Sequence, residues 1–469
     1  MLTRLEVNGF KNLFNVAVDF GVYTCIAGPN AVGKSNLFDV IEFISLLSST
    51  TFLDAAQNLR VAGDRVGDPK TLFWLDGSGR YENMELAVEM IVTPQVEDDF
   101  GQPAAATSTF LRYELELAYE APTAKVSGRF GNIRLVRESL TYIGKGKAKN
   151  HLKWVRDRAF IDSLVMNTRR TKYISTDRDA AGTTIIQVHQ DGGSRGQPRK
   201  SSAERTQRTV VSTTNTSDDP TILAAKREMQ QWRKLALEPS AMRSPDSTTD
   251  KSVIGSNGSH LAAALARLMD DDQDVLARVA ATASALTDVR EVEIDFDEKR
   301  DILTLQAKVG SGPFLPAQVL SEGTLRFLAL SVIEADSEFG GVICMEEPEN
   351  GIHPAKIASL VDLLRDLAVD MEDEIGPGNP LRQVLVNTHS PHFVAEQSPE
   401  DLLLALPMSI LRNGHEVKSM QLIPMAGTWR DSGGGYSGSK ALITDYLILP
   451  EDAPMQMSAT EIDAVRARR

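Results

Sequence analysis

The feature that most restricts the fold of this chain is a glycine-bounded loop between an apolar strand and an apolar helix. Residues 22–27, VYTCIA, form a short and mostly apolar run that leads straight into the loop GPNAVGKS at residues 28–35. After the loop, apolar side chains recur at helical spacing to about residue 47. A strand, a tight loop and a helix in this order predict an α/β fold with the loop at the carboxyl end of a strand.

The spacing within this loop is that of a phosphate cradle. The segment fits the P-loop pattern in full: glycine, four residues, then Gly-Lys-Ser. Glycine lets backbone N–H groups approach an anion, and the helix N-terminus adds a positive partial charge. A chance glycine-rich turn is the alternative, but the flanking strand and helix favour the P-loop. Lys34 is expected near the β- and γ-phosphates, and the Ser35 hydroxyl on Mg²⁺. The predicted nucleotide-binding residues are Gly28, Asn30, Ala31, Val32, Gly33, Lys34, Ser35 and Asn36.

A second apolar strand ends in a group of acids. Residues 341–345, GVICM, run into Glu346, Glu347, Pro348 and Glu349. Ionised acids are costly to bury unpaired, so they need either solvent or a ligand at this place. In the functional interpretation Glu346 holds Mg²⁺ and Glu347 polarises the water that attacks the γ-phosphate. In the other interpretation the strand end is simply solvated, and this segment alone does not decide between them.

A third apolar strand, QVLVNT at residues 383–388, ends in His389 and Ser390. A lone histidine is more often structural than functional. His389 would nevertheless lie at the carboxyl edge of the sheet, where ligands bind in open α/β folds, so we predict a γ-phosphate contact. His353 and His392 lack such a position and are interpreted as structural.

The segment LSEGTLR at residues 320–326 precedes another apolar helix. Ser321 is a natural N-cap, and Gly323 leaves the amides of the first turn open to a ligand. The segment therefore predicts a second anion-binding helix end.

Taken in order, the P-loop, LSEGTLR, the strand with EEPENGIHP and then NTHSPH resemble the ABC-type ATPases of the RecF, overcoming-lysogenisation-defect and structural-maintenance-of-chromosomes group. The resemblance covers about residues 1–50 and 315–395, and includes Asn8, Phe10 and Lys11 in the opening strand. It implies ATP and Mg²⁺ as ligands, catalysis by Glu347 and His389, and a homodimer or larger homo-oligomer. It further implies that one subunit's signature residues, Ser321, Glu322 and Gly323, contact ATP held by the other subunit, with Asn350 in the interface loop.

The resemblance is incomplete at three positions. Glu346 stands where most members have aspartate, and Thr324 replaces the glutamine of the signature motif. The glutamine of the family's Q-loop has no clear counterpart, and Gln57 is a candidate by position only. These departures leave ATP binding intact and bear on the rate of hydrolysis.

The expected fold class is α/β: a P-loop NTPase with an ABC-type head, in which helices flank a mixed sheet, plus a β-rich and helical insertion lobe. The two halves of the head are residues 1–50 and 315–400, and an antiparallel β lobe of the head is expected at 51–143. An insertion or lid lobe at 144–314 and a C-terminal extension at 401–469 complete the chain. Helical patterns occur at 221–236 and 259–286, and a β-hairpin is expected to turn at Asp297–Arg300. The tail shows short strand-like pieces and a glycine-rich loop at 432–439.

Residues 144–220 are rich in basic and small polar residues and poor in periodic apolar ones. A solvated, partly mobile insertion is one interpretation, and a surface that contacts the phosphate backbone of a nucleic acid is the other. The basic residues are Lys145, Lys147, Lys149, Lys153, Arg156, Arg158, Arg169, Arg170, Lys172, Arg195, Arg199, Lys200, Arg205 and Arg208.

The overall balance is acidic, with a formal net charge of -14, so any nucleic-acid contact needs such a local basic surface. No apolar run is long enough to cross a bilayer, and the first residues lack a signal-peptide pattern. We therefore expect a cytoplasmic protein with no membrane partner. Cys25 and Cys344 each lie in an apolar segment and are expected to be buried, and no Cys/His spacing indicates a zinc site.

Three functions remain open. The region between the two halves of the head has no heptads, and no nuclease-like acid cluster follows His389, so the chain is similar to stand-alone anti-phage ATPases of the Septu and PARIS type. On this hypothesis it senses a trigger and regulates a separate effector, a nuclease or toxin. A RecF-like DNA repair ATPase and an ATP-stabilised scaffold with little turnover are the alternatives.

Overall fold

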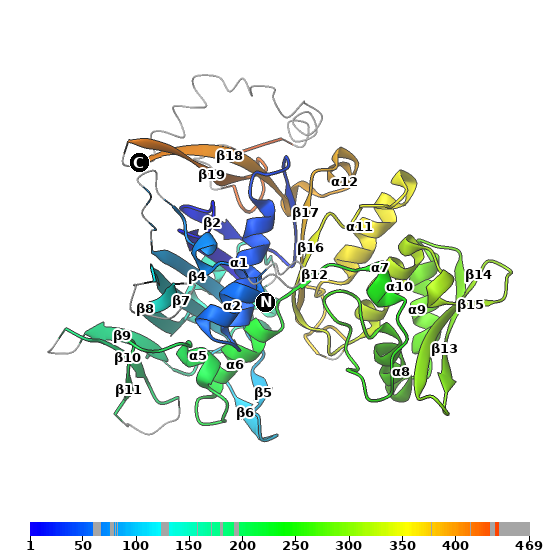
Figure 1. The fold of residues 1–469 in the computed structure, drawn as a ribbon, viewed down its shortest axis with the longest axis horizontal. Coiled ribbons are helices and arrows are strands. Elements are labelled where there is room, and N and C mark those ends of the chain that lie inside the picture. Colours follow the sequence, from blue (N-terminus) through cyan, green and yellow to red (C-terminus); the bar gives the residue numbers. More distant parts are fainter. Residues whose placement is uncertain are drawn as a thin grey trace. The chain divides into compact units, whose positions relative to one another are not determined.

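The computed structural model describes residues 1–59, 67–75, 79, 81, 83–122, 131–156, 158–169, 171–178, 182–191, 197–376, 378–412, 414–431 and 437–439. The chain divides into two compact units, Met1–Trp232 with Pro399–Arg469, and Arg233–Ser398. Most of the expected glycine-rich loop at 432–439, and the last thirty residues, 440–469, lie outside the described residues. Each unit is described by itself below (Figure 1).

The first unit is built on a large antiparallel sheet. Its strand order is β11-β10-β9-β8-β7-β4-β1-β2, and a small ribbon, β5-β6, stands beside it. The strands are β1 (Leu2–Asn8), β2 (Val16–Asp19), β3 (Tyr23–Ala27), β4 (Met84–Ile91), β5 (Gln95–Glu97), β6 (Pro103–Ala105), β7 (Phe110–Glu120), β8 (Asn132–Tyr142), β9 (Ile174–Arg178), β10 (Thr184–Val188), β11 (Arg199–Ser202), β18 (Leu402–Arg412) and β19 (His415–Pro424).

The helices of this unit include short turns as well as two long segments. They are α1 (Lys34–Leu47), α2 (Phe52–Asn58), η1 (Pro69–Leu72), α3 (Lys145–His151), α4 (Arg158–Leu164), α5 (Val210–Thr213), α6 (Pro220–Gln230) and η4 (Pro399–Asp401).

The alternation of apolar and polar residues in β4, β7 and β8 produces the antiparallel strands that the sequence predicts within residues 51–143, and β1, from outside that range, joins the same sheet. Leu5 lies opposite Val18 on one side and Val88 on the other, and all three are buried. In β4 and β7, Leu86 faces Leu115 in the same way. Because side chains alternate between the faces of a strand, this register gathers the apolar residues on one side.

A second sheet segment carries the loop at residues 28–33. Strand β3 is buried throughout and pairs in parallel with β18, which in turn pairs antiparallel with β19. The pairing is thus mixed, as expected. The strand-like pieces predicted after residue 400 form a long hairpin, orange in Figure 1, rather than short fragments.

Residues 144–220 contain more regular structure than their composition suggests. Strands β9, β10 and β11 extend the large sheet, with α3 and α4 before them in the chain and α5 after them. Few residues here are apolar, so the strand signal is weak. Pairing in the series β8, β9, β10 and β11, which is available only in the folded chain, stabilises the strands.

The second unit combines a parallel three-strand segment with a separate antiparallel sheet. Its strands are β12 (Arg233–Leu235), β13 (Val289–Asp297), β14 (Ile302–Val309), β15 (Phe314–Pro316), β16 (Gly341–Glu346) and β17 (Arg382–Thr388). Its helices are α7 (Pro239–Met242), α8 (Leu261–Asp271), α9 (Val275–Ser284), η2 (Ala317–Val319), α10 (Glu322–Ala335), η3 (Pro354–Lys356), α11 (Ile357–Asp366) and α12 (Pro391–Ala395).

Strand β16 pairs in parallel with β12 and with β17. The predicted strands at 341–345 and 383–388 are confirmed, as is the hairpin that turns between Asp297 and Ile302. The helical prediction for 221–236 is wrong at its end, because α6 stops at Gln230 and residues 233–235 form β12. Pairing with β16 outweighs the local helical preference there.

The helical pattern at 259–286 is two helices, α8 and α9, separated at Asp272–Asp274. Taken together, the two units confirm an α/β fold in which helices accompany mixed sheets. Cys25 and Cys344 are both buried, as predicted. Among the described residues, no helix is long and apolar enough to span a membrane.

Candidate nucleotide site

The loop after β3 has a backbone that only small residues allow. Gly33 has a φ of 116°, and a Cβ there would lie 2.5 Å from Asn12 Nδ2. A Cβ at Gly28 would lie 2.6 Å from the carbonyl oxygen of Ala405, on β18. Ala31, although not glycine, has a φ of 62°. Gly33 is therefore required by conformation as well as by contact, and Gly28 by its close contact with Ala405.

The loop presents unused donors. Among the described residues, nothing accepts a hydrogen bond from the backbone amides of Asn30, Ala31, Val32 or Gly33. Helix α1 begins directly afterwards at Lys34, and its N-cap residue, Gly33, supplies no capping side chain. Successive open amides at a helix N-terminus form a nest that suits a phosphate group.

Three side chains of the pattern surround this nest. Lys34 is buried, and its Nζ donates to the carbonyl oxygens of Gly28 and Pro29, both at 2.7 Å. Ser35 and Asn36 are half-buried in the first turn of α1. The lysine ammonium thus already lies against the loop that it is predicted to serve.

Sequence analysis missed Asn12, which fixes the loop from outside. Its Nδ2 donates to the carbonyl oxygen of Val32 at 3.0 Å, and its Oδ1 accepts from Asn36 Nδ2 at 2.8 Å. The neighbouring Lys11 forms an ion pair of 2.6 Å with Asp39 of α1, whose carboxylate is fully buried. The family resemblance of the opening segment could have drawn attention to residue 12. No sequence spacing, however, predicts a contact between residue 12 and residue 32.

The second unit contains the predicted acids. Glu346 is the last residue of β16, and its Oε1 lies 2.7 Å from Lys234 Nζ on the neighbouring strand β12. Lys234 was not singled out from the sequence, because the parallel pairing of β12 with β16 is a tertiary feature. The lysine neutralises a carboxylate that a strand end would otherwise leave half-buried and unpaired.

Glu347 is held on both carboxylate oxygens. His389 Nδ1 donates to Oε1 at 2.7 Å, and Asn350 Nδ2 donates to Oε2 at 2.7 Å. The Glu347 amide donates to the carbonyl oxygen of Asn387 at 2.9 Å, and the residue has a φ of 48°. A non-glycine residue in this conformation is strained and is held by its surroundings. The structure thus brings together three residues that the sequence singled out separately.

Two buried polar atoms beside Glu347 have no hydrogen-bond partner within the described chain: Asn387 Nδ2 and Glu349 Oε2. The other carboxylate oxygen of Glu349 accepts from the Thr388 hydroxyl. Burial raises the pKa of Glu349, and the nearby charge of Glu347 acts in the same direction. Buried polar atoms without partners are uncommon in proteins, and they gather here at the carboxyl ends of β16 and β17.

Helix α10 begins as predicted. The Ser321 hydroxyl caps it by accepting from the Thr324 amide at 3.2 Å, and a Cβ on Gly323 would meet nothing within 4 Å. Ser321 and Glu322 are exposed. The start of this helix is open to a ligand approaching from outside the unit.

Arg326 connects this helix to the acid group. Its Nη2 pairs with Glu322 at 2.7 Å, and its Nη1 donates to the carbonyl oxygen of Asn350 at 2.8 Å. Asn350 in turn holds Glu347. A continuous chain of contacts therefore runs from the first turn of α10 to the Glu347 carboxylate.

The remaining sequence candidates have local roles. His353 caps η3 by accepting from the Ala355 amide at 3.2 Å, which supports the structural interpretation. Gln57 is half-buried on α2. Among the basic residues at 144–220, several are neutralised within the unit: Lys145 by Asp162, Arg156 by Glu400, Arg169 by Asp191 and Arg199 by Asp219. Arg170 and Arg195 lie outside the described residues.

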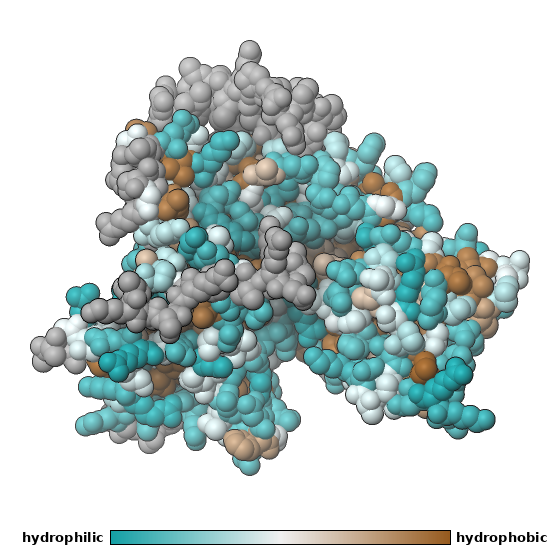
Figure 2. Space-filling view, viewed as in Figure 1, coloured by the Kyte–Doolittle hydropathy of each residue, from teal (hydrophilic) through white to brown (hydrophobic). Residues whose placement is uncertain are grey.

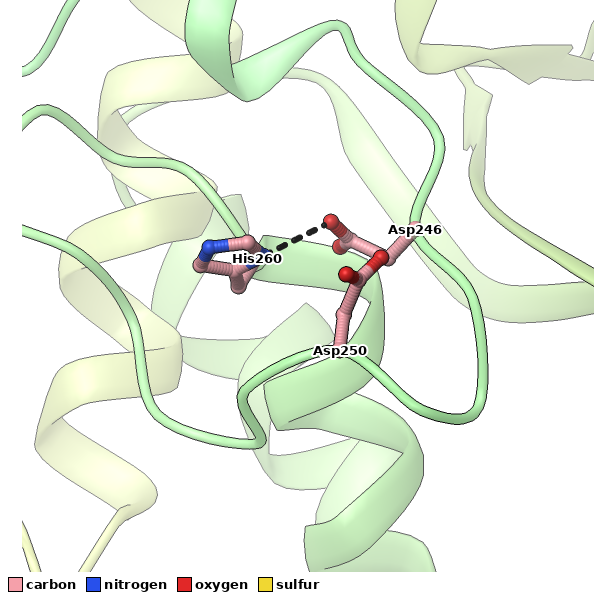
Figure 3. Close-up of side chains that lie close together, drawn as sticks. All are labelled: Asp246, Asp250 and His260. Atoms are coloured by element: carbon pink, nitrogen blue, oxygen red, sulfur yellow. Dashed lines mark hydrogen bonds and ion pairs between the residues drawn. The ribbon is translucent and has the colours of Figure 1, made fainter.

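One further cluster could be mistaken for a metal centre. Asp246, Asp250 and His260 offer ligand atoms within 4.8 Å of one another (Figure 3). Asp246 Oδ2, however, accepts from the amides of Ala262 and Ala263, and Oδ1 accepts from His260 Nδ1 at 3.2 Å. Asp246 therefore caps α8, and the cluster is accounted for as a helix start.

Comparisons with known proteins give one family match. The family described as "AAA domain, putative AbiEii toxin, Type IV TA system" matches residues 121–395. No curated protein matches the chain. Solved structures that resemble it include an SMC head bound to the C-winged helix domain of ScpA, with 13% identity, a TM-score of 0.47, and coverage of 90% of this chain and 98% of that one.

Two other structures are similar to a lesser degree. An SMC head domain with an extended coiled coil, bound to the C-terminal domain of ScpA derived from Pyrococcus furiosus, has 12% identity, a TM-score of 0.42, and coverage of 90% and 96%. The SMC head domain from Thermotoga maritima has 12% identity, a TM-score of 0.35, and coverage of 90% and 98%. At these scores the fold assignment rests on the strand order given above.

Proposed function

This chain belongs to the AAA-domain family whose description names the AbiEii toxin, and on that premise we propose that it binds and hydrolyses ATP. The observation that carries the proposal is the nest of open amides from Asn30 to Gly33, placed between a buried strand and the N-terminus of α1. Such a nest is matched by a polyphosphate, because each open amide gains a charge-assisted hydrogen bond.

The residues have distinct roles in this proposal. Lys34 turns from the loop carbonyls to the β- and γ-phosphates, and Asn12 keeps the loop in shape. Glu347 accepts a proton from the attacking water, with His389 and Asn350 orienting its carboxylate. The Ser35 hydroxyl and the Glu346 carboxylate are oxygen donors of the kind that Mg²⁺ prefers, and Mg²⁺ would neutralise phosphate charge there.

We further propose that two copies join head-to-tail, so that the α10 start of one copy meets the ATP bound by the other. The exposed Ser321 and Glu322 and the open space at Gly323 support this arrangement. Arg326 and Asn350 would then report the phosphate contact to Glu347 within the same chain. The signature of one copy thereby controls the catalytic acid that the same copy carries.

The biological role that we favour is regulation of a separate effector in anti-phage defence, in the cytoplasm. The family description, which refers to a toxin and a toxin–antitoxin system, supports defence over a RecF-like repair role. Several basic residues at 144–220 are already paired with acids of the same unit, so a contact with nucleic acid would be made by the others. The exposed Lys147, Lys149, Lys153, Lys172, Lys200 and Arg205 are candidates for such a contact.

The test measures nucleotide affinity and phosphate release with ATP and Mg²⁺. Lys34→Ala is expected to weaken ATP binding at least about tenfold, because it removes a cation from the phosphate site. Glu347→Gln is expected to keep ATP binding and to lower phosphate release about 10²- to 10⁴-fold, the range for loss of a general base.

Two exposed residues serve as matched controls, Lys251→Ala and Glu374→Gln, and both are expected to behave as wild type. Unchanged turnover in Glu347→Gln would remove Glu347 from the catalytic role. Wild-type protein that binds ATP without turnover would favour the scaffold function instead.

A further inference from the structure

A groove lies in the second unit between helix α9 and strand β13. Its volume is about 390 Å³. The residues that line it are Leu276, Ala277, Ala280, Ala281 and Ser284 of α9, and Val289, Arg290, Glu291 and Val292 of β13. None of these residues belongs to the nucleotide site described above, so the groove needs its own explanation.

The strand side of the groove is a sheet edge. In the sheet β13-β14-β15, β13 pairs with β14 along one side, and no other described strand pairs with its second side. The strand runs for 9 residues, which is long for an edge. An edge of this length offers a row of backbone donors and acceptors to another extended segment, and native proteins usually cover or block such edges.

The two faces of β13 differ in chemistry. Glu291, Glu293, Asp295 and Asp297 alternate along one face, and Val292, Ile294 and Phe296 along the other. Lys308 pairs with Glu291 at 2.8 Å. Within the part of the chain that the structure describes, Glu293 and Asp295 have no ion-pair partner. Arg300 Nε lies 3.7 Å from Asp297 Oδ2, so Glu293 and Asp295, in the middle of the strand, are the two acids of this face that the described residues leave without an ion pair.

The apolar face of the sheet extends beyond its helical cover. Val292 is buried against the helices, but Phe296 is 46% exposed. In Figure 2, apolar surface is visible on the part of this unit where Figure 1 places β14 and β15. Phe296 thus leaves unburied apolar area on the open-edge strand itself, and the surface at β14 and β15 lies on the other side of the sheet.

The helix side of the groove is lined with small side chains. Ala277, Ala281 and Ser284 recur at spacings of four and three residues, so they share one face of α9, and all three are exposed. Small residues along that face leave room for side chains that enter between helix and strand. An edge strand facing a helix across a groove is the arrangement by which sheets take up a peptide strand.

We propose that this groove binds an extended segment of a partner protein, which adds to β13 as a further strand and carries alternating basic and apolar residues. The basic side chains meet the acidic face of β13, and the apolar ones enter the groove beside the α9 alanines. A second copy of β13 would place acids against acids, so the charges select a basic strand from another protein. Insofar as the segment belongs to the effector, the inference rests on the proposed function, although the binding itself needs no nucleotide.

The test uses the full chain and nine-residue synthetic peptides. One peptide alternates lysine and valine, a second has the same composition in blocks, and a third alternates glutamate and valine. The alternating basic peptide is expected to bind at least about tenfold more tightly than either of the others, measured by calorimetry or fluorescence anisotropy.

Two variants locate the site. Ala281→Trp fills the groove from an exposed position of α9, and Glu293→Lys with Asp295→Lys reverses the charge of the edge. Each is expected to weaken the alternating basic peptide at least about tenfold, and the charge reversal to favour the glutamate peptide. Asp373→Lys with Glu374→Lys makes the same change of charge at exposed acids outside the groove and is expected to bind as wild type.

The inference is overturned if the three peptides bind alike, or if the groove variants bind as tightly as the control. Thermal unfolding of each variant checks that the fold is kept. Phosphate release is measured in the same variants to separate the two proposals. Selective peptide binding by a protein without ATPase activity would support the groove as a binding site and contradict the proposed function. ATPase activity without selective peptide binding would support the proposed function and contradict peptide binding at the groove.

Discussion

Glu138, on β8, has a fully buried carboxyl group that accepts three hydrogen bonds from the surrounding residues. The amides of Val210 and Val211 donate to it at 2.8 and 3.1 Å, and the Tyr113 hydroxyl donates at 3.1 Å. Burial raises its pKa from 4.5 to about 7, against the opposing effect of these donors. The group connects the large sheet to the start of α5, far along the chain.

This shift predicts a pH dependence of stability. Because the pKa is higher in the folded state, the folded protein binds more protons between pH 4.5 and about 7, and the contribution of Glu138 to stability is lost as pH rises through that window. Since a shift of one pKa unit corresponds to about 1.36 kcal/mol, the loss of unfolding free energy is on the order of 3 kcal/mol. Glu138→Gln, which cannot ionise, is expected to flatten this decline.

Urea unfolding at pH 5 and pH 8 measures the effect. The difference in unfolding free energy between wild type and Glu138→Gln should move in favour of the variant as pH rises. If that difference were the same at both pH values, the carboxyl would have an ordinary pKa in the folded protein.

At the scale of elements, the P-loop is held by neighbours as well as by its own sequence. Asn12 links the segment after β1 to the loop at Val32 and to the start of α1 at Asn36. Gly28 lies against Ala405 of β18. The conformation of the nest therefore depends on two elements that are distant in sequence.

Asn12→Ala is expected to weaken ATP binding about five- to tenfold without unfolding the protein, since each lost hydrogen bond contributes about 1 kcal/mol. Calorimetric titration with ATP checks this result, with Asn132→Ala at an exposed position as the matched control. An unchanged affinity would mean that the loop keeps its shape without Asn12.

At the scale of the whole molecule, the proposed assembly makes a specific demand on Gly323. A Cβ there has nothing within 4 Å in the single chain, so a larger residue should not disturb folding. Two copies that close on ATP through the α10 start would, in contrast, have a phosphate at this place.

Gly323→Trp is therefore expected to keep ATP binding and thermal stability but to lose ATP-dependent assembly and turnover. Molecular mass measured by light scattering with ATP and Mg²⁺ provides the readout, with Glu347→Gln as the variant expected to remain assembled and Lys34→Ala as the one expected not to assemble. Assembly of Gly323→Trp at the wild-type level would contradict closure through the α10 start.

Sequence alone determined the features whose signals are local. The P-loop, the strands that end at Glu346 and Thr388 and the cap at Ser321 each follow from spacing within a short segment, because a strand, a loop and a helix start each have their own residue preferences. The antiparallel sheet at β4, β7 and β8 follows from strict alternation in the same way.

Only the tertiary structure decided which distant residues meet. Asn12 at the P-loop, Lys234 beside Glu346 and Arg326 at Asn350 are brought into contact by pairing and packing across long stretches of chain. The end of α6 and the strands β9 to β11 also depended on partners that no local pattern reveals. The backbone preference of a segment depends on the few residues within it, so the sequence can predict it. The open edge of β13 and the groove beside it form only when the sheet and α9 pack together.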